Sequence, residues 1–434
     1  MDMSRSYPHT CAAGSWRRVG AAALAASLTA VSPAWAQSAV TDWNATADTV
    51  APGPPPIRSR ILAMTEIAVH DALNSIDARY ASYLNLPPAP ATASPAAAVA
   101  AATYQVLRPF LSAPALATLT NTYTTRIAAL TCPAAAPACV TEGVSAGDTA
   151  AATISALRAN DGSATPHLPY TLLAAPGVYQ VTPGGPPSQF AGWANVTPFA
   201  MNSGAQFRSD PSEIFDLLGE VYTREYNEVK RVGAIDAEAL GNRTADQSAV
   251  ARFWPGGGAN WTGSARIIAT GRGLDEWQLA RLHALVNMAL SDAAVSVFDT
   301  KYAYNFWRPV TAIRAGGTDG NPATAPDPAW LPFQGTPPYP DYTCGLTTQT
   351  GSAVEVLRRF FGSDTIAFST TGAGMTRSYT SLSQAAAEAV DARVFGGMHF
   401  RAGCVQGVRQ GEHVGRFVIQ HFLKPLKRQK NPGR

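Results

Sequence analysis

The sequence predicts an all-α protein, a large helical bundle with long Pro/Gly-rich loops, for which two packed bundles are the favoured arrangement. Apolar residues recur at helical spacing along most of the chain. Alternating strand patterns are scarce, and no strand–helix–strand rhythm occurs. The 36 Gly and 33 Pro residues among 434 punctuate the segments between helices. This length is enough for one large domain or two fused ones.

Residues 1–36 are typical of a cleavable secretory signal. Basic residues precede an apolar stretch from Val19, and a small-residue cleavage pattern ends at Ala36. An uncleaved membrane anchor is the alternative, but Ser and Pro interrupt this short stretch. We therefore expect export to a periplasm or secretion, with no stable membrane insertion once the signal is removed.

The remaining chain is expected to form an N-terminal helical part, 37–270, and a C-terminal helical part, 271–423, followed by a solvated basic tail, 424–434. Asp275 and Gln278 form a capping pair at the start of the most strongly predicted helix. Helices are expected over 57–84, 95–131, 143–159, 211–231, 244–253, 275–301, 347–361, 381–394 and 404–423. The Pro/Gly-rich segments 160–212 and 315–341 are expected to be loops.

Composition excludes several classes of protein. Hydrophobic residues make up 46% of the chain and charged residues 15%, which is the balance of a compact protein rather than a disordered one. The formal net charge is only +3, and no basic stripe with interleaved aromatic residues occurs. Nucleic acid is therefore not an expected partner.

The cysteines are interpreted in light of export. Four cysteines remain after residues 1–36 are removed, and an even count in an oxidising compartment suggests two disulfides. Cys132 and Cys139 flank a short loop whose closure is worth about 2.5 kcal/mol. Cys344 and Cys404 are then paired by elimination. Two free thiols or a metal-binding pair is the alternative, although no CxxC motif or His-rich cluster supports zinc.

One sequence motif typical of catalysis does not indicate a catalytic site here. Gly143-Val-Ser145-Ala-Gly147 matches the G-x-S-x-G pattern of serine hydrolases. That chemistry needs a strained turn between a strand and a helix, whereas here the string opens an Ala-rich helix.

Three separated segments carry cationic or anion-binding groups. Lys301 and Arg308 are seven residues apart, two helical turns, and so are expected on the same helix face. Gly345 lies at a predicted helix start, where free amides can bind an anion. Arg393 and His399 flank a Gly pair that lets the chain turn the imidazole beside the guanidinium. Together these segments predict an oxyanion site.

The order and spacing of the three segments resemble the vanadium-dependent haloperoxidase family, which shares its helical-bundle site with type 2 phosphatidic acid phosphatases. The resemblance implies that Lys301, Arg308 and Arg393 grip the oxygens of vanadate, or of phosphate as the alternative occupant. It implies that His399 binds vanadium or acts as a phosphate-accepting nucleophile. The implied partners are a small-molecule oxyanion and a halide or organic substrate.

The second segment departs from the family pattern. Where the family usually has Pro-Ser-Gly-His, this chain has Thr343-Cys344-Gly345-Leu346. Gly345 keeps its place, but the Ser hydroxyl becomes the Cys344 sulfur, and Leu346 cannot move a proton as the acid–base His does. Because general acid–base catalysis contributes about 10²–10⁴-fold, we expect an impaired acid–base step. Four groups near the motifs are candidates to replace that His: Asp341, Tyr342, His413 and His421.

Three functions are compatible with these observations. The first is an exported haloperoxidase-like oxidoreductase that binds vanadate or phosphate and oxidises halide with peroxide. The second is a hydrolase that performs phosphatase or diphosphate chemistry on good leaving groups. The third is a non-catalytic, oxyanion-binding relative. Halide oxidation, phosphate release and binding without turnover distinguish the three.

Overall fold

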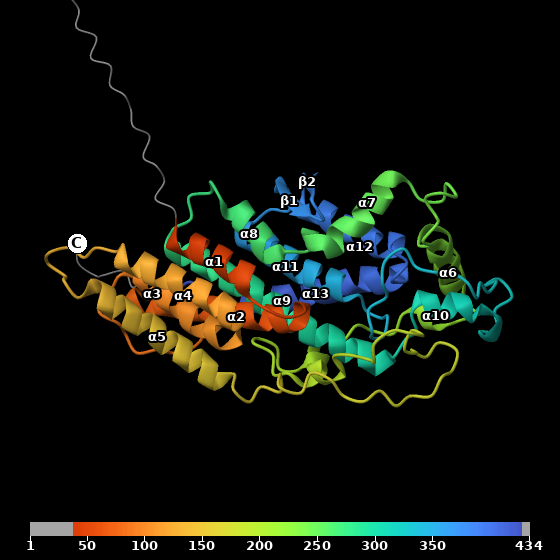
Figure 1. Ribbon diagram of the computed structural model, residues 1–434, viewed down its shortest axis with the longest axis horizontal. Helices are drawn as coiled ribbons and strands as arrows, with labels where there is room; N and C mark the ends of the chain where they lie inside the picture. Colours follow the sequence, from red (N-terminus) through yellow and green to blue (C-terminus); the bar gives the residue numbers. More distant parts are fainter. Residues whose placement is uncertain (1–37, 428–434) are drawn as a thin grey trace, which may run out of the picture. The chain divides into compact units, whose positions relative to one another are not determined.

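A computed structural model describes residues 38–427, and it confirms the all-α prediction (Figure 1). The predicted signal, 1–36, and residues 428–434 of the tail lie outside this range. The helices are α1 (Ala39–Val50), α2 (Pro55–Ile76), α3 (Pro95–Leu107), α4 (Ala113–Ala128), α5 (Cys139–Leu157), α6 (Glu220–Val232), α7 (Ala245–Phe253), α8 (Trp261–Ala269), α9 (Glu276–Tyr304), α10 (Pro309–Arg314), α11 (Gly345–Phe361), α12 (Leu382–Phe395) and α13 (Arg401–His421).

Helix α9 forms the centre of the protein. It is 29 residues long, and Asp275 and Gln278 form the predicted capping box at its start. Apolar and small residues surround the helix on almost every side, and such a helix must be covered by other helices. It packs against α2 from the N-terminal part and against α11 and α13 from the C-terminal part (Figure 1).

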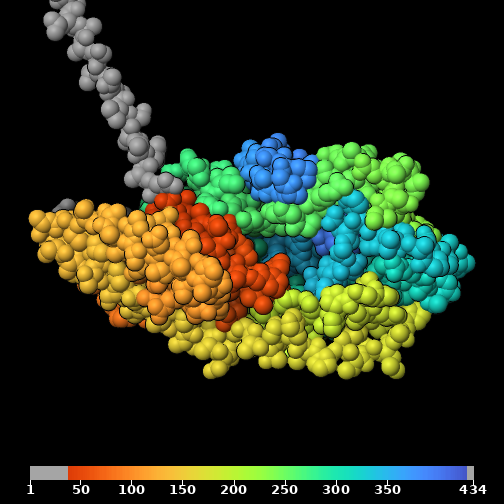
Figure 2. All heavy atoms as spheres, viewed as in Figure 1, coloured from red at the N-terminus to blue at the C-terminus, as the bar shows by residue number. Residues whose placement is uncertain are grey.

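The two predicted parts pack into one compact unit that begins at Ser38. The boundary between residues 270 and 271 stays a prediction. Figure 2 shows that one face is hollowed between the N-terminal helices, in red, and the loop before α11, in cyan, with blue atoms of the C-terminal helices at its floor. No helix in the range 38–427 has the length and hydropathy that a membrane span requires.

Local chemistry explains where the helices differ from prediction. The helix expected over 95–131 is divided into α3 and α4, because Pro109 cannot donate the amide hydrogen bond of a continuous helix. Helix α2 stops at Ile76 rather than Leu84, and beyond it the amide of Tyr83 donates to the Asp71 carboxylate at 2.8 Å. Helices α1, α8 and α10 were not predicted.

A short antiparallel hairpin was also not predicted. Strands β1 (Phe368–Gly372) and β2 (Met375–Tyr379) pair across Ala373 and Gly374, whose φ angles are +49° and +75°. A two-residue turn with positive φ at both positions matches the twist of a hairpin. The buried–exposed alternation of β1 was too short to identify in the sequence.

The G-x-S-x-G string serves helix packing. A Cβ atom at Gly143 would lie 2.3 Å from the carbonyl oxygen of Ser94, and one at Gly147 would lie 2.4 Å from that of Ala98. Only glycine therefore allows α5 to approach α3 so closely. Nearby, Cys132 and Cys139 form the predicted disulfide.

Candidate oxyanion site

The fold brings the three predicted segments together at the ends of several helices. Lys301 lies in the last turn of α9, and Arg308 directly precedes α10. Gly345 is the first residue of α11, and Arg393 lies in the last turn of α12. His399 lies in the turn between α12 and α13. All but the half-buried Gly345 are buried.

The prediction that Lys301 and Arg308 share a helix face is wrong. Helix α9 ends at Tyr304, and Asn305 adopts a left-handed conformation that turns the chain before Arg308. The two cations meet instead at the segment before α11. The ammonium of Lys301 donates to the carbonyl oxygens of residues 340 and 341 at 2.8 and 2.9 Å, and Arg308 Nε donates to that of residue 339 at 2.7 Å.

Lys301 can lose its charge near neutral pH. Its side chain is completely buried, and this burial, together with the neighbouring Arg308 guanidinium, lowers its pKa to about 7. The Asp341 carboxylate acts in the opposite direction. The cationic strength of the site therefore depends on pH.

Two guanidinium groups present unused donors inside the protein. Arg308 Nη1 donates to the carbonyl oxygen of Met398 and contacts His399 Nε2, each at 2.9 Å, but its Nη2 has no hydrogen-bond partner. Arg393 is 6% exposed, and its Nε also lacks a partner. A buried N–H without an acceptor costs about 1–3 kcal/mol or more when charged. These donors indicate that an anion completes the site.

His399 is oriented by Asp341. The carboxylate Oδ1 lies 2.8 Å from His399 Nδ1, and both side chains are 1% exposed. The contact is a short ion-pair distance rather than an aligned hydrogen bond, since neither carboxylate oxygen has a partner at hydrogen-bond geometry. A carboxylate beside Nδ1 favours the proton on that nitrogen, so the Nε2 lone pair is the acceptor that faces Arg308 Nη1 at 2.9 Å. A ligand or an electrophile at Nε2 has to displace this contact.

Of the four candidate proton donors, only Asp341 contacts His399. The Tyr342 hydroxyl donates to the carbonyl oxygen of Asp210 at 2.7 Å, away from the imidazole. His413 and His421 are exposed on α13. Among these four candidates, Asp341 is therefore the one whose side chain contacts His399.

The start of α11 has room for a ligand. Cys344 is the N-cap residue, but its side chain makes no capping hydrogen bond. A Cβ atom at Gly345 would meet no other atom within 4 Å, so there is space beside the first turn of the helix. The first amides of a helix have no partner within it and can bind an anion. Leu346 is half-buried and packs beside Cys344 and Cys404. An apolar side chain therefore lies next to Gly345, where the sequence analysis expects an impaired acid–base step.

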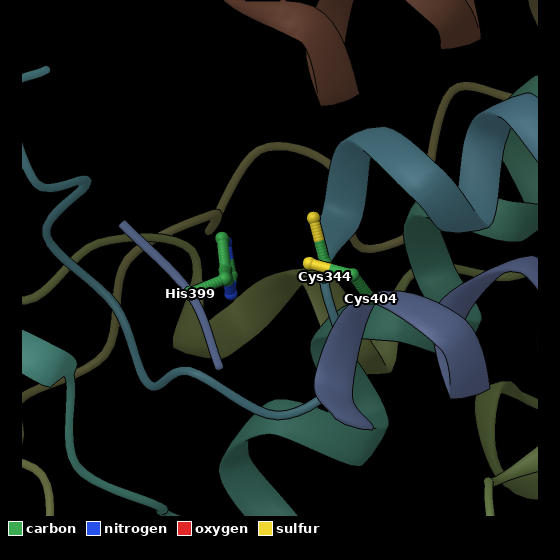
Figure 3. Close-up of side chains that lie close together, drawn as sticks. All are labelled: Cys344, His399 and Cys404. Atoms are coloured by element: carbon green, nitrogen blue, oxygen red, sulfur yellow. The ribbon is translucent and has the colours of Figure 1, made fainter. Parts of the chain in front are cut away.

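The predicted disulfide between Cys344 and Cys404 is absent. Both are buried free thiols whose sulfurs lie close together (Figure 3). The Cys404 side chain hydrogen-bonds to the Cys344 sulfur. Although burial raises the pKa of Cys344, this hydrogen bond and the charges of His399 and Arg393 lower it well below its usual value. Burial and the partner sulfur raise the pKa of Cys404. Of the two thiols, Cys344 is therefore the one that more readily becomes a thiolate.

Sequence reasoning missed Tyr339. Its ring centroid lies 5.2 Å from both Lys301 Nζ and the Arg308 guanidinium carbon, so its π face covers two cations. The residue lies in the Pro-rich segment before Gly345, where Tyr339 and Tyr342 gave no periodic signal. The aromatic residue helps to seal the buried charges from water.

Comparisons with known proteins find relatives of the C-terminal part of the chain. Residues 281–428 match the family described as the VCPO second helical-bundle domain. The chain is 29% identical over 188 residues to vanadium chloroperoxidase from Curvularia inaequalis, a match that covers 36% of this chain and 30% of that protein. The chain thus matches less than a third of the length of this curated relative.

Solved structures support the fold over a longer range. The first bacterial vanadium-dependent iodoperoxidase structure superposes with a TM-score of 0.75 at 24% identity, covering 90% of this chain and 97% of that one. A holo-type bacterial vanadium-dependent chloroperoxidase gives a TM-score of 0.67 at 18% identity, covering 86% and 94%. At these identities the similarity shows the fold alone.

Proposed function

Through its C-terminal bundle the chain belongs to the vanadium haloperoxidase family, and from this premise we propose that it binds vanadate and oxidises a halide or small organic substrate with peroxide. The observation that carries the proposal is the pair of buried guanidinium groups with unused donors, Arg308 and Arg393, beside His399. Residues 1–36 support the further proposal that the protein acts after export.

The residues fit a tetrahedral oxyanion. Lys301, Arg308 and Arg393 would neutralise its charge, and the amide of Gly345 would donate to one oxygen. His399 Nε2 would supply the ligand to vanadium while Asp341 holds the Nδ1 proton. Bound vanadate supplies Lewis-acid activation of peroxide. Phosphate is also a tetrahedral oxyanion and is the alternative occupant.

The reaction also needs a side chain that delivers a proton. Halide oxidation consumes one peroxide, one halide and one proton and gives hypohalous acid and water, so a group must deliver that proton. Leu346 cannot do so, and Asp341 is the nearest carboxyl group to the imidazole. Burial of the cations excludes water, which strengthens their hold on the anion.

The direct test of this function is peroxide-dependent halide oxidation by the vanadate-loaded protein. We expect slow, vanadate-dependent turnover that is lost in His399→Ala, because this substitution removes the vanadium ligand. His413→Ala, a substitution of an exposed histidine on α13, should leave the rate unchanged. Equal rates for parent and His399→Ala would refute the assignment.

The affinity for oxyanions should fall as pH rises through the pKa of Lys301. This pKa is lowered to about 7, so the amine is cationic below that value and neutral above it. A bound anion favours the cationic form, which places the fall at or above that pKa. Sulfate is a suitable probe because it stays a dianion from about one unit below to about one unit above the pKa.

Calorimetry should therefore show tighter sulfate binding on the acid side. In Lys301→Met the affinity should be lower and much less dependent on pH. The interpretation fails if the parent and Lys301→Met show the same pH profile.

Phosphoryl transfer is the second candidate. An imidazole held by a carboxylate, as His399 is by Asp341, is the arrangement that activates a nucleophile. Since Leu346 offers no acid for the leaving group, turnover should be confined to activated aryl phosphates or diphosphates. Phosphate release from such esters without halide oxidation would favour this function, and oxyanion binding without either turnover would favour a non-catalytic relative.

A further inference from the structure

The two thiols and the imidazole form a cluster that oxyanion binding does not explain. One ligand atom from each of Cys344, His399 and Cys404 lies within 4.8 Å of the others. The three side chains are 0%, 1% and 0% exposed. Figure 3 shows both sulfurs on the side of α11 and α13 that faces His399. The oxyanion site needs the imidazole but gives the Cys404 sulfur no role.

We infer that Cys344, His399 and Cys404 form a site for a thiophilic divalent cation such as zinc. Thiolate and imidazole are the ligands that zinc prefers, and two Cys with one His leave a fourth position open. Bonds of about 2.3 Å to sulfur and about 2.0 Å to nitrogen place tetrahedral ligand atoms roughly 3.5–3.8 Å apart. The observed cluster requires only a small contraction to reach that geometry.

The surroundings of the cluster support a metal ligand role for His399. Metal-binding histidines usually hold their second ring nitrogen against a carboxylate, and Asp341 Oδ1 lies 2.8 Å from Nδ1. The backbone holds the two cysteines in register, since the Cys344 amide donates to the carbonyl oxygen of Gly403 at 2.9 Å. Preformed ligands lose little freedom when the ion binds.

The ion has to displace one cationic contact, because Arg308 Nη1 lies 2.9 Å from His399 Nε2. The ligand charges offset this cost. Binding releases one proton from each thiol, and the two thiolates balance the two charges of the cation. The metal with its two thiolates has no net charge, so it adds no positive charge beside Arg308 and Arg393. His399 is shared with the proposed vanadate site, so the cation and vanadate should compete.

The test is a cobalt titration of the reduced protein under anaerobic conditions. Cobalt(II) replaces zinc in such sites and gives sulfur-to-cobalt charge-transfer absorption when thiolates bind it. We expect one Co²⁺ per chain with this absorption, displaced by Zn²⁺. Cys344→Ser and Cys404→Ser should each lose most of the sulfur-to-cobalt intensity. Asp341→Asn should keep it but weaken affinity by about 10–100-fold.

Thiol alkylation of the parent protein tests the same site without any cysteine variant. At a urea concentration where both thiols of the metal-free parent are alkylated, Zn²⁺ should slow that alkylation, because the two thiols are buried in the folded protein. Cys132 and Cys139 are already bonded and do not react. Absence of sulfur-to-cobalt absorption, its full persistence in Cys404→Ser, or equal alkylation rates with and without zinc would each overturn the site. Arg393→Ala separates the two proposals, because it should lose vanadate affinity and keep Co²⁺.

Discussion

The Leu346→His substitution is expected to raise the rate of peroxide-dependent halide oxidation by about 10²-fold or more. Leu346 lies in the first turn of α11, next to Gly345, and is only half-buried, so a ring can be accommodated. An imidazole there has a pKa near neutrality and can deliver the proton that the reaction consumes. The measurement is kcat for halide oxidation with vanadate supplied to both proteins.

Leu346→Phe is the matched control for this prediction. It places a ring of similar size at the same position without a titratable group, and it should give no gain. Robust oxidation by the parent that Leu346→His does not change would show that another residue already moves the proton. Asp341 is then the group to test, since it is the candidate that contacts His399.

The Arg393→Ala substitution should weaken vanadate or phosphate binding by about 2–3 kcal/mol, or roughly 30- to 150-fold. Arg393 is almost completely buried, and its Nε has no protein partner. An anion that pairs with it is shielded from water, where a charge-assisted hydrogen bond is strong. Calorimetric titration of both proteins with phosphate measures the difference.

Arg401→Ala is the matched control, because it removes a guanidinium that lies outside the oxyanion site. Arg401 lies on α13 and forms ion pairs with Glu228 and Asp391 at 2.7 and 2.6 Å, outside the oxyanion site. We expect its removal to change phosphate affinity little. Equal phosphate affinity in Arg393→Ala and the parent would exclude Arg393 from the site.

Helical periodicity was sufficient to predict the fold class, because long helices such as α9 repeat their apolar pattern over many turns. Short elements could not be predicted in this way. The β1–β2 hairpin depends on two residues with positive φ, and only one of them is glycine. The division of α3 from α4 followed from Pro109, a signal that the Ala-rich composition of the region concealed.

The candidate site shows the same limit. The order of the motifs identified Lys301, Arg308, Arg393 and His399, but counting helical turns could not reveal the break at Asn305. The contact between Asp341 and His399 depends on tertiary packing between distant segments. For the same reason the sequence offered a partner for Cys344 in Cys404 but gave no sign that His399 would join the two sulfurs.

Calorimetric titration of the purified protein with vanadate tests whether the buried cations and His399 form a site for one tetrahedral oxyanion. We expect saturable binding of one vanadate per chain, and phosphate should displace it because both anions use the same donors. Absence of saturable binding, or vanadate binding that excess phosphate leaves unchanged, would contradict it.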